Sequence, residues 1–254
     1  MRIVLGNIWN CLKNKKLPLW DYVILTASNE SQAQSYRMQI QYRLDHGMLP
    51  KSIHYAVLPD PDGKRVGSGG ATLNVLRYIH QDAGSFDDKR ILVIHSGGDS
   101  KRVPQYSACG KLFSPVPRLL PNGRRSTLFD EFMISMCGVA ARIRAGMLVC
   151  SGDVLLLFNP LQIDFYGSGA AALSIKEPAE IGKNHGVYRV DEQGNVGGFL
   201  HKKTVDQLHA LQAADENGNV DIDTGAVIMD TDLLKALYKL VDTPEQFDAY
   251  VNEN

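Results

Sequence analysis

The segment Ser96–Lys111, SGGDSKRVPQYSACGK, combines the residue types that bind phosphate. It follows the apolar run ILVIH and opens with two glycines, so backbone N–H groups can approach an anion without interference from a Cβ atom. Arg102 is expected to neutralise the β- and γ-phosphates of a nucleotide, and Lys111 to reach back to the same triphosphate. The other candidates in the segment are Gly97, Gly98, Asp99, Ser100 and Lys101. The alternative is a surface turn with solvated cations, which the position directly after a buried strand disfavours.

A second glycine-rich segment, VGSGGATLNVL, spans Val66–Leu76. Because it opens a predicted helix, its N–H groups and the helix dipole are suited to hold a phosphate or to face a base. The candidate nucleotide-binding residues are Gly67, Ser68, Gly69 and Gly70. The alternative is a tight turn in which Thr72 caps the helix. Neither segment has the G-x-G-x-x-G or G-x-x-x-x-G-K-[ST] spacing, which disfavours dehydrogenases and P-loop nucleotide triphosphatases.

Two aspartates are candidate ligands for Mg²⁺, which uses one or two carboxylates together with substrate phosphates. Asp153 lies in CSGDVLL, at the end or in the middle of a predicted strand, where an unpaired carboxylate is costly to bury. The alternative for this residue is a salt bridge with Arg142 or Arg144. The second candidate is Asp223 in DIDTGAV, where strand alternation places Asp221 on the same side.

The lysine pair Lys202 and Lys203 follows the strand-like sequence GGFL. Either lysine is placed to contact a substrate phosphate. The alternative is that both are solvated at a sheet edge, where lysines are common.

The elements that must position these residues alternate between strand and helix. Apolar runs predict strands over residues 22–27, 53–58, 90–95 and 147–156. Helical spacing covers 31–47, the stretch from Ala71, and 126–146, with Ser28 or Asn29 and Ser126 or Thr127 as caps. Residues 59–70 are expected to form a loop. This alternation predicts an α/β fold with a mainly parallel central sheet and ligands at the carboxyl ends of its strands.

After Asp164 the sequence becomes rich in β-forming residues, in three pieces separated by Gly- and Asn-containing turns. The chain is therefore expected to have a β-rich C-terminal half. It contains no internal repeat and no low-complexity linker. We expect one domain over residues 1–254 rather than a freely hinged second domain.

Composition excludes several classes of protein. Lys and Arg total 27 against 28 Asp and Glu, so the chain has no basic excess that would favour nucleic acid or an anionic membrane. Its cysteines, Cys11, Cys109, Cys137 and Cys150, show no paired spacing, which predicts reduced thiols and disfavours zinc. No stretch has the pattern of a secretory signal or a membrane span, so the cytoplasm is the expected compartment.

Taken in order, these motifs resemble those of sugar nucleotidyltransferases. The shared features are the GG-x-[GS]-x-R pattern ending at Arg102, the downstream Lys111, the GD of Asp153, the hairpin GVYRVDEQGNV before HKK, and the D-x-G of 223–225. More closely, GSGGATLNVL followed by IHSGGDSKRVP resembles the fucose-1-phosphate guanylyltransferase family. That family includes the pyrophosphorylase part of bifunctional L-fucokinase/GDP-fucose pyrophosphorylases.

The resemblance runs from about Trp20 to the end of the chain and implies a Rossmann-like nucleotide-diphospho-sugar transferase fold. It implies Mg²⁺-dependent, in-line transfer of GMP from GTP to L-fucose 1-phosphate, giving GDP-L-fucose and pyrophosphate. Thr224 and Gly225, with Lys202 and Lys203, are then expected at the sugar phosphate. Ser100 and Lys101 stand where sugar nucleotidyltransferases usually carry glycine and threonine, as in the fucose branch.

The β-helical region and the kinase part of the family have no counterpart in this sequence, so the domain is expected to be incomplete at its C-terminus. Two alternatives stay open: a pyrophosphorylase for another sugar 1-phosphate, and a non-catalytic nucleotide-sugar binding fragment. Kinase activity is disfavoured because the sequence lacks the P-x-x-x-G-L-x-S-S-A phosphate loop.

Overall fold

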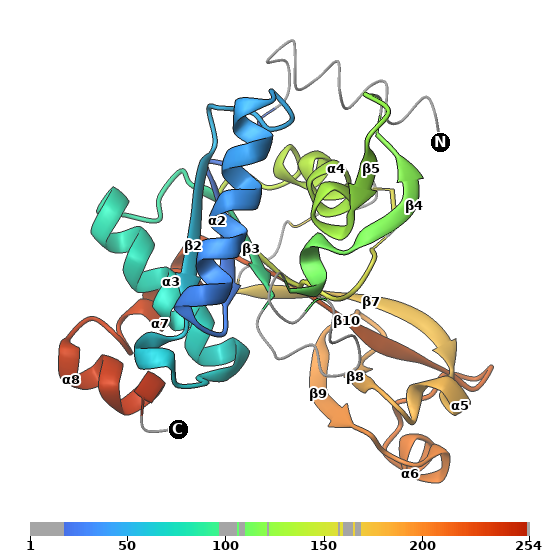
Figure 1. Ribbon diagram of the computed structural model, residues 1–254. Coiled ribbons are helices and arrows are strands. Elements are labelled where there is room, and N and C mark those ends of the chain that lie inside the picture. The colour runs from blue at the N-terminus through green and yellow to red at the C-terminus, as the bar shows by residue number, and fades with distance from the viewer. Residues whose placement is uncertain are drawn as a thin grey trace. The chain divides into compact units, whose positions relative to one another are not determined.

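The computed structural model describes residues 18–96, 106, 110–120, 122–156, 158–159, 165 and 169–252 (Figure 1). Contacts within the chain divide it into two compact units. Unit 1 contains the described residues up to Ala171 and those from Ile228 onward, and unit 2 is Ala172–Val227. The expectation of one nucleotidyltransferase domain over the whole chain stays a prediction.

The centre of unit 1 is a parallel sheet built from β1 (Tyr22–Ala27), β2 (His54–Pro59), β3 (Arg90–His95) and β6 (Gly146–Ser151). These strands lie in the order β2-β1-β3-β6. All six side chains of β1 are buried, as expected for a parallel sheet covered on both faces. The predicted α/β class and its parallel strands are therefore confirmed for this unit.

The strands of unit 1 are joined by α2 (Glu30–Asp45), α3 (Gly67–Ala83) and α4 (Leu128–Ala140). The chain moves from β1 to β2 through α2, and then back past β1 to β3 through α3. Because parallel crossovers are right-handed, these opposite steps place α2 and α3 on opposite faces of the sheet. The described residues of unit 1 thus form a three-layer α/β arrangement.

Side-chain caps fix where two of these helices begin. The side chain of Asn29 accepts a hydrogen bond from the backbone N–H of Gln32 at the start of α2. Thr127 and Asp130 form a reciprocal capping box at the start of α4. Of the caps considered from sequence, Asn29 and Thr127 are the ones that the structure uses.

The carboxyl ends of three strands of the sheet lie in register. Thr26 is opposite His95, and His95 is opposite Ser151. Directly after β6, the Gly152 N–H donates to the His95 carbonyl over 2.7 Å. A Cβ atom at Gly152 would lie 2.8 Å from that oxygen, so the close approach of the two chains requires glycine. The residues that follow these strands are thereby held at one edge of the sheet.

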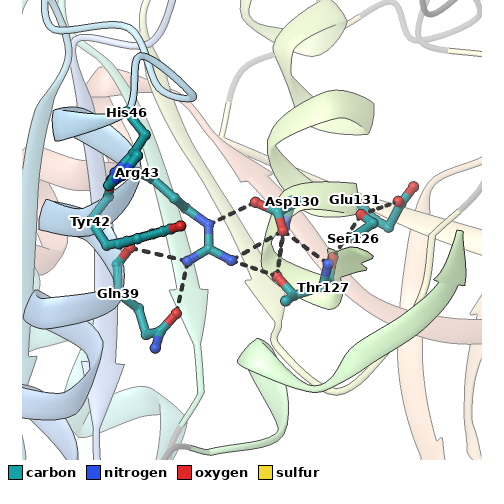
Figure 2. A network of polar contacts seen from close by, with 8 residues as sticks. All are labelled: Gln39, Tyr42, Arg43, His46, Ser126, Thr127, Asp130 and Glu131. Atoms are coloured by element: carbon teal, nitrogen blue, oxygen red, sulfur yellow. Dashed lines mark hydrogen bonds and ion pairs between the residues drawn. The ribbon is translucent and has the colours of Figure 1, made fainter. Parts of the chain in front are cut away.

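A buried ion pair joins α2 to α4 (Figure 2). The Arg43 guanidinium donates to both carboxylate oxygens of Asp130, over 2.7 and 3.1 Å, and to the Thr127 hydroxyl over 3.1 Å. The two charged side chains are 5% and 8% exposed. The same guanidinium lies over the rings of Phe113 and Phe129, at 5.1 and 5.6 Å from their centres. Arg43 therefore ties both helices to the segment that contains Phe113.

Several elements of unit 1 were not predicted from the sequence. They are the 3₁₀ turns Pro61–Gly63 and Lys111–Phe113, the antiparallel hairpin of β4 (Pro115–Leu119) and β5 (Arg125–Thr127), and the C-terminal helices α7 (Thr231–Tyr238), α8 (Pro244–Phe247) and Asp248–Asn252. The C-terminal helices bury Val241, Phe247 and Val251 against Val66 and Leu73. The start of α3 is thus packed against the end of the described chain.

Unit 2 is antiparallel. It contains α5 (Ala179–Gly182), β8 (Gly186–Val190), β9 (Val196–His201) and α6 (Val205–Ala210), together with most of β7 (Ala170–Pro178) and β10 (Asn219–Met229). Strand β8 pairs antiparallel with both β9 and β10, and β7 pairs with β10. The β-rich C-terminal half is confirmed, although the sequence did not predict α6. Within the described part of the chain, no helix has the length and apolarity needed to cross a bilayer.

Candidate functional site

A cleft of about 590 Å³ opens at the carboxyl edge of the parallel strands of unit 1. Residues that follow each strand line it: Asn29 after β1, Asp60 after β2, Ser96 after β3 and Asp153 after β6. This edge is where ligands bind in open α/β sheets. Of the residues proposed from sequence, the cleft brings together Gly67, Ser68, Lys111 and Asp153.

The two charged candidates in the cleft contact each other. Lys111 Nζ lies 3.4 Å from Asp153 Oδ2, and the Ser151 hydroxyl donates to Asp153 Oδ1 over 2.8 Å. The side chains of Lys111 and Asp153 are 38% and 53% exposed, so both charges remain open to a ligand. A cation and a carboxylate with solvent access suit a triphosphate carried with a divalent ion.

The structure corrects the surroundings expected for Asp153. The predicted strand 147–156 ends earlier, because β6 stops at Ser151, and Asp153 lies exposed in the turn that follows. Arg142 and Arg144, considered as partners, both precede β6, whose six residues span about 20 Å. They therefore lie at the opposite end of the strand, and Lys111 takes the role of partner.

Gly110 and Tyr36 fix the position of Lys111. Gly110 has φ 66° and ψ 156°, a conformation essentially restricted to glycine. A Cβ atom there would lie 1.8 Å from the hydroxyl oxygen of Tyr36. That hydroxyl lies 2.9 Å from both the carbonyl and the side-chain oxygen of Ser96, and it donates to the carbonyl. A single buried tyrosine therefore sets the spacing between Ser96 and the turn that carries Lys111.

The GSGG sequence forms the first turn of α3 rather than the end of a loop. The helix begins at Gly67, four residues before the predicted start at Ala71. Gly67 and Ser68 line the cleft, and Gly69 and Gly70 complete the same turn. Val66 supplies no side-chain cap to this helix, which leaves the first-turn N–H groups without a side-chain acceptor at that position. This favours the phosphate-binding interpretation of the segment.

The alternative in which Thr72 caps α3 is wrong. Thr72 lies inside the helix, and its hydroxyl donates to the carbonyl of Ser68, one turn earlier, over 2.9 Å. The same hydroxyl oxygen lies 2.9 Å from His95 Nε2.

His95 lines the cleft and was not among the residues proposed from sequence. Its Nδ1 lies 3.1 Å from the Thr26 hydroxyl, so both ring nitrogens contact threonine hydroxyls. Burial lowers the pKa of His95 to about 4, which keeps the imidazole neutral at physiological pH. The signal that was available in the sequence is its place as the last residue of a central strand, directly before Ser96.

Six proposed residues lie outside the described part of the chain: Gly97, Gly98, Asp99, Ser100, Lys101 and Arg102. Their proposed nucleotide contacts stay predictions. Ser96 and Lys111, on either side of residues 97–109, both line the cleft. Cys11 and Cys109 also lie outside the described residues, whereas Cys137 and Cys150 are buried.

The candidates for the sugar phosphate belong to unit 2. Lys202 is exposed and Lys203 half-buried, at the junction between β9 and α6. The Thr224 hydroxyl donates to the Leu173 carbonyl over 2.6 Å, and Gly225 takes a positive φ of 72°. The structure thus shows a backbone-supporting role for Thr224, while contacts of all these residues with substrate stay predictions.

Asp223 holds the turn at Gly225. Its Oδ1 accepts hydrogen bonds from the Tyr188 hydroxyl and the Gly225 N–H, each over 2.8 Å. The neighbouring Asp221, which strand alternation places on the same side as Asp223, pairs with Lys176 at 3.1 Å and is 13% exposed. Among the described residues, no group of three or more His, Cys, Asp or Glu side chains is placed to hold a metal ion. Asp153 alone, beside substrate phosphates, fits the way Mg²⁺ is usually held.

Comparison with known proteins decides the family. A family model described as the fucose pyrophosphorylase domain matches residues 83–253. The chain belongs to this family. The match covers β3, Lys111 and Asp153 in unit 1 and all of unit 2. The resemblance to fucose-1-phosphate guanylyltransferases is therefore confirmed.

Curated relatives agree with this family. The chain is 31% identical over 247 residues to an Arabidopsis thaliana protein named bifunctional fucokinase/GDP-fucose pyrophosphorylase, with 84% of this chain and 23% of that protein covered. It is 32% identical over 209 residues to the fucose-1-phosphate guanylyltransferase of Mus musculus, with 76% of this chain and 35% of that protein covered. The human protein of the same name is 30% identical over 218 residues, covering 79% of this chain and 35% of its own length. The chain thus spans between about a quarter and a third of these relatives.

Proposed function

We propose that this chain transfers GMP from GTP to L-fucose 1-phosphate, giving GDP-L-fucose and pyrophosphate, and that the cleft of unit 1 binds GTP. The observation that carries the proposal is the meeting of Lys111, Asp153 and the first turn of α3 in one cleft of a fucose pyrophosphorylase family member. The names of the relatives supply the sugar and the nucleotide product.

The proposed reaction is an in-line displacement. A phosphate oxygen of L-fucose 1-phosphate attacks the α-phosphorus of GTP and forms the new P–O bond. The bond from that phosphorus to the oxygen bridging to the β-phosphate breaks, and its electron pair leaves with pyrophosphate. The attacking oxygen is already anionic, so the step needs neither a protein nucleophile nor a general base. Catalysis then rests on orientation and on neutralisation of charge.

The residues of the cleft divide these tasks. The N–H groups of 67–70 are suited to hold phosphate oxygens at the positive end of the α3 dipole. Lys111 and Arg102 would neutralise the leaving β- and γ-phosphates. Asp153 would hold Mg²⁺, which supplies further charge neutralisation when it is bound with the triphosphate. GTP and the divalent ion would then replace the Lys111–Asp153 contact with contacts of their own.

Residues of unit 2 are proposed to hold the acceptor. Lys202 and Lys203 offer cationic groups to the phosphate of the sugar, and Thr224 and Gly225 are proposed to lie beside the same phosphate. Asp223 was also expected to bind metal. Because its Oδ1 already accepts two hydrogen bonds, this ligand role rests on its other oxygen.

The experiment is pyrophosphate release by the full chain from GTP and Mg²⁺, across a panel of sugar 1-phosphates. The proposal requires release that depends on L-fucose 1-phosphate. Preference for a different sugar 1-phosphate would identify another pyrophosphorylase. Calorimetric binding of GTP without pyrophosphate release in any mixture would indicate a nucleotide-binding fragment instead.

A further inference from the structure

We infer that His95 is a positioning residue, which fixes the first turn of α3 for nucleotide binding through a directed chain of hydrogen bonds from Thr26 to Ser68. This inference rests on the proposed function of the cleft. It assigns a role to a partly buried imidazole of the cleft wall that takes no part in the proposed reaction.

The direction of the chain follows from the acceptor at its end. The Ser68 carbonyl can only accept a hydrogen bond, so the Thr72 hydroxyl donates its proton to that carbonyl, over 2.9 Å. The Thr72 oxygen must then accept a proton from His95 Nε2, 2.9 Å away. Nδ1 of the neutral ring is consequently unprotonated and accepts a hydrogen bond from the Thr26 hydroxyl, over 3.1 Å. Each proton is used once, and the imidazole is the Nε2–H tautomer.

The series of hydrogen bonds connects the central sheet of unit 1 to the glycine-rich first turn of α3. Thr26 and His95 are paired residues of the buried central strands β1 and β3. Ser68 lies in a turn with three glycines, which lose more conformational freedom on ordering than other residues do. That turn also lacks a side-chain cap from Val66. The contact between His95 and Thr72 therefore ties the turn to the sheet at the edge of the cleft.

Acid–base catalysis is not the role that this geometry favours. Both ring nitrogens already have threonine partners, and the proposed nucleophile carries no proton to remove. The neutral state of the partly buried ring also preserves these hydrogen bonds, because protonation of Nδ1 would end its role as an acceptor. A residue in this position acts through Ser68 and its neighbours rather than on the reacting atoms.

Paired substitutions separate the hydrogen bonds from mere packing. Thr72→Val keeps the shape of the side chain but removes the hydroxyl, whereas Thr72→Ser keeps the hydroxyl. His95→Leu removes both ring nitrogens, whereas His95→Gln retains a donor near the Nε2 position. His54→Leu is the matched control, since His54 opens β2 at the other end of the strands and its Nε2 contacts the Tyr78 hydroxyl.

We expect Thr72→Val and His95→Leu each to raise the KM for GTP about tenfold, with a smaller change in kcat, as loss of a partly buried hydrogen bond predicts. Thr72→Ser and His95→Gln should recover most of the loss. Because both side chains belong to one series of hydrogen bonds, the KM of the double variant Thr72→Val/His95→Leu should be close to that of either single variant. Equal effects of valine and serine at Thr72, or unchanged KM in His95→Leu, would overturn the inference. The calorimetric Kd for GTP supplies the same comparison if turnover is absent.

Nitrogen-15 NMR of the imidazole rings in the full chain tests this series of hydrogen bonds independently of enzymatic activity. The expected result is an Nε2–H tautomer for His95 that does not titrate between about pH 5 and pH 8. An Nδ1–H tautomer, or titration in that range, would refute the assignment even in an active protein. An Nε2–H tautomer in a chain that releases no pyrophosphate would instead leave the positioning of the turn intact and count against the proposed reaction.

Discussion

The ammonium of Lys111 lies 3.4 Å from the carboxylate of Asp153, although the two residues are separated by helix α4 and strands β4 to β6 in the sequence. Both side chains are substantially exposed, and ion pairs of this kind contribute little to stability. The pairing therefore indicates a place where opposite charges are kept ready for a charged ligand.

Removal of either charge should damage turnover more than folding. We expect Lys111→Met and Asp153→Asn each to lower pyrophosphate release by about 10²–10³-fold, while the thermal midpoint changes by only a few degrees. The matched control is Lys183→Met, because Lys183 is an exposed lysine paired with Glu180 in unit 2. Near-normal turnover in the Lys111 and Asp153 variants would remove both residues from the reaction.

Gly110→Ala should be strongly destabilising. The substitution combines a glycine-only backbone conformation with a Cβ atom 1.8 Å from the Tyr36 hydroxyl, for a cost of about 2–5 kcal/mol in the free energy of unfolding. Gly123→Ala is the control, because Gly123 also has a positive φ, of 80°, but faces open space. Urea denaturation of both variants makes the comparison, and an equal loss in the two would show that the contact with Tyr36 is unimportant.

Two buried tyrosine hydroxyls should behave in opposite ways. Tyr36→Phe removes a donor to the Ser96 carbonyl and should cost about 1–2 kcal/mol, together with a loss of turnover through the displaced Lys111 turn. Within the described residues, the Tyr55 hydroxyl is buried without a hydrogen-bond partner, so Tyr55→Phe should be neutral or stabilising. Equilibrium unfolding of the pair tests this, and a neutral Tyr36→Phe would contradict the account of how Ser96 is held.

The sequence predicted best what depends on local pattern. The largely apolar runs of β1 and β3 identify strands buried on both faces, and Ser126 or Thr127 was identified as the cap of α4. Lys111 and Asp153 were also proposed, because glycines and charges that follow such strands indicate a ligand edge.

What the sequence did not reveal depends on contacts between distant segments. His95 acquires its neutral state and its partners only when β1, β3 and α3 come together. Glycine propensity favours a loop at residues 67–70, yet Thr72 bonded to Ser68 and the packing of the C-terminal helices on Val66 hold that stretch as a helical turn. The pairing of Arg43 with Asp130 is likewise a contact between residues 87 positions apart.

The buried ion pair between Arg43 and Asp130 in Figure 2 should contribute more to the free energy of unfolding than an exposed ion pair on the same helix. Arg43→Leu leaves the Asp130 carboxylate buried without its partner, and we expect a loss of about 3–5 kcal/mol. Arg37→Leu on the same helix breaks an exposed pair with Glu30 and should cost at most about 1 kcal/mol. Chemical denaturation measures both, and similar losses would mean that burial of the Arg43 pair is not what matters.

The central claim is tested most directly by phosphorus-31 NMR of the full chain incubated with GTP, Mg²⁺ and L-fucose 1-phosphate. The account predicts GDP-L-fucose and pyrophosphate in equal amounts, and at most about a hundredth of either when the Lys111→Met variant is incubated for the same time. Release of orthophosphate, or a spectrum that stays unchanged although GTP binds, would contradict it.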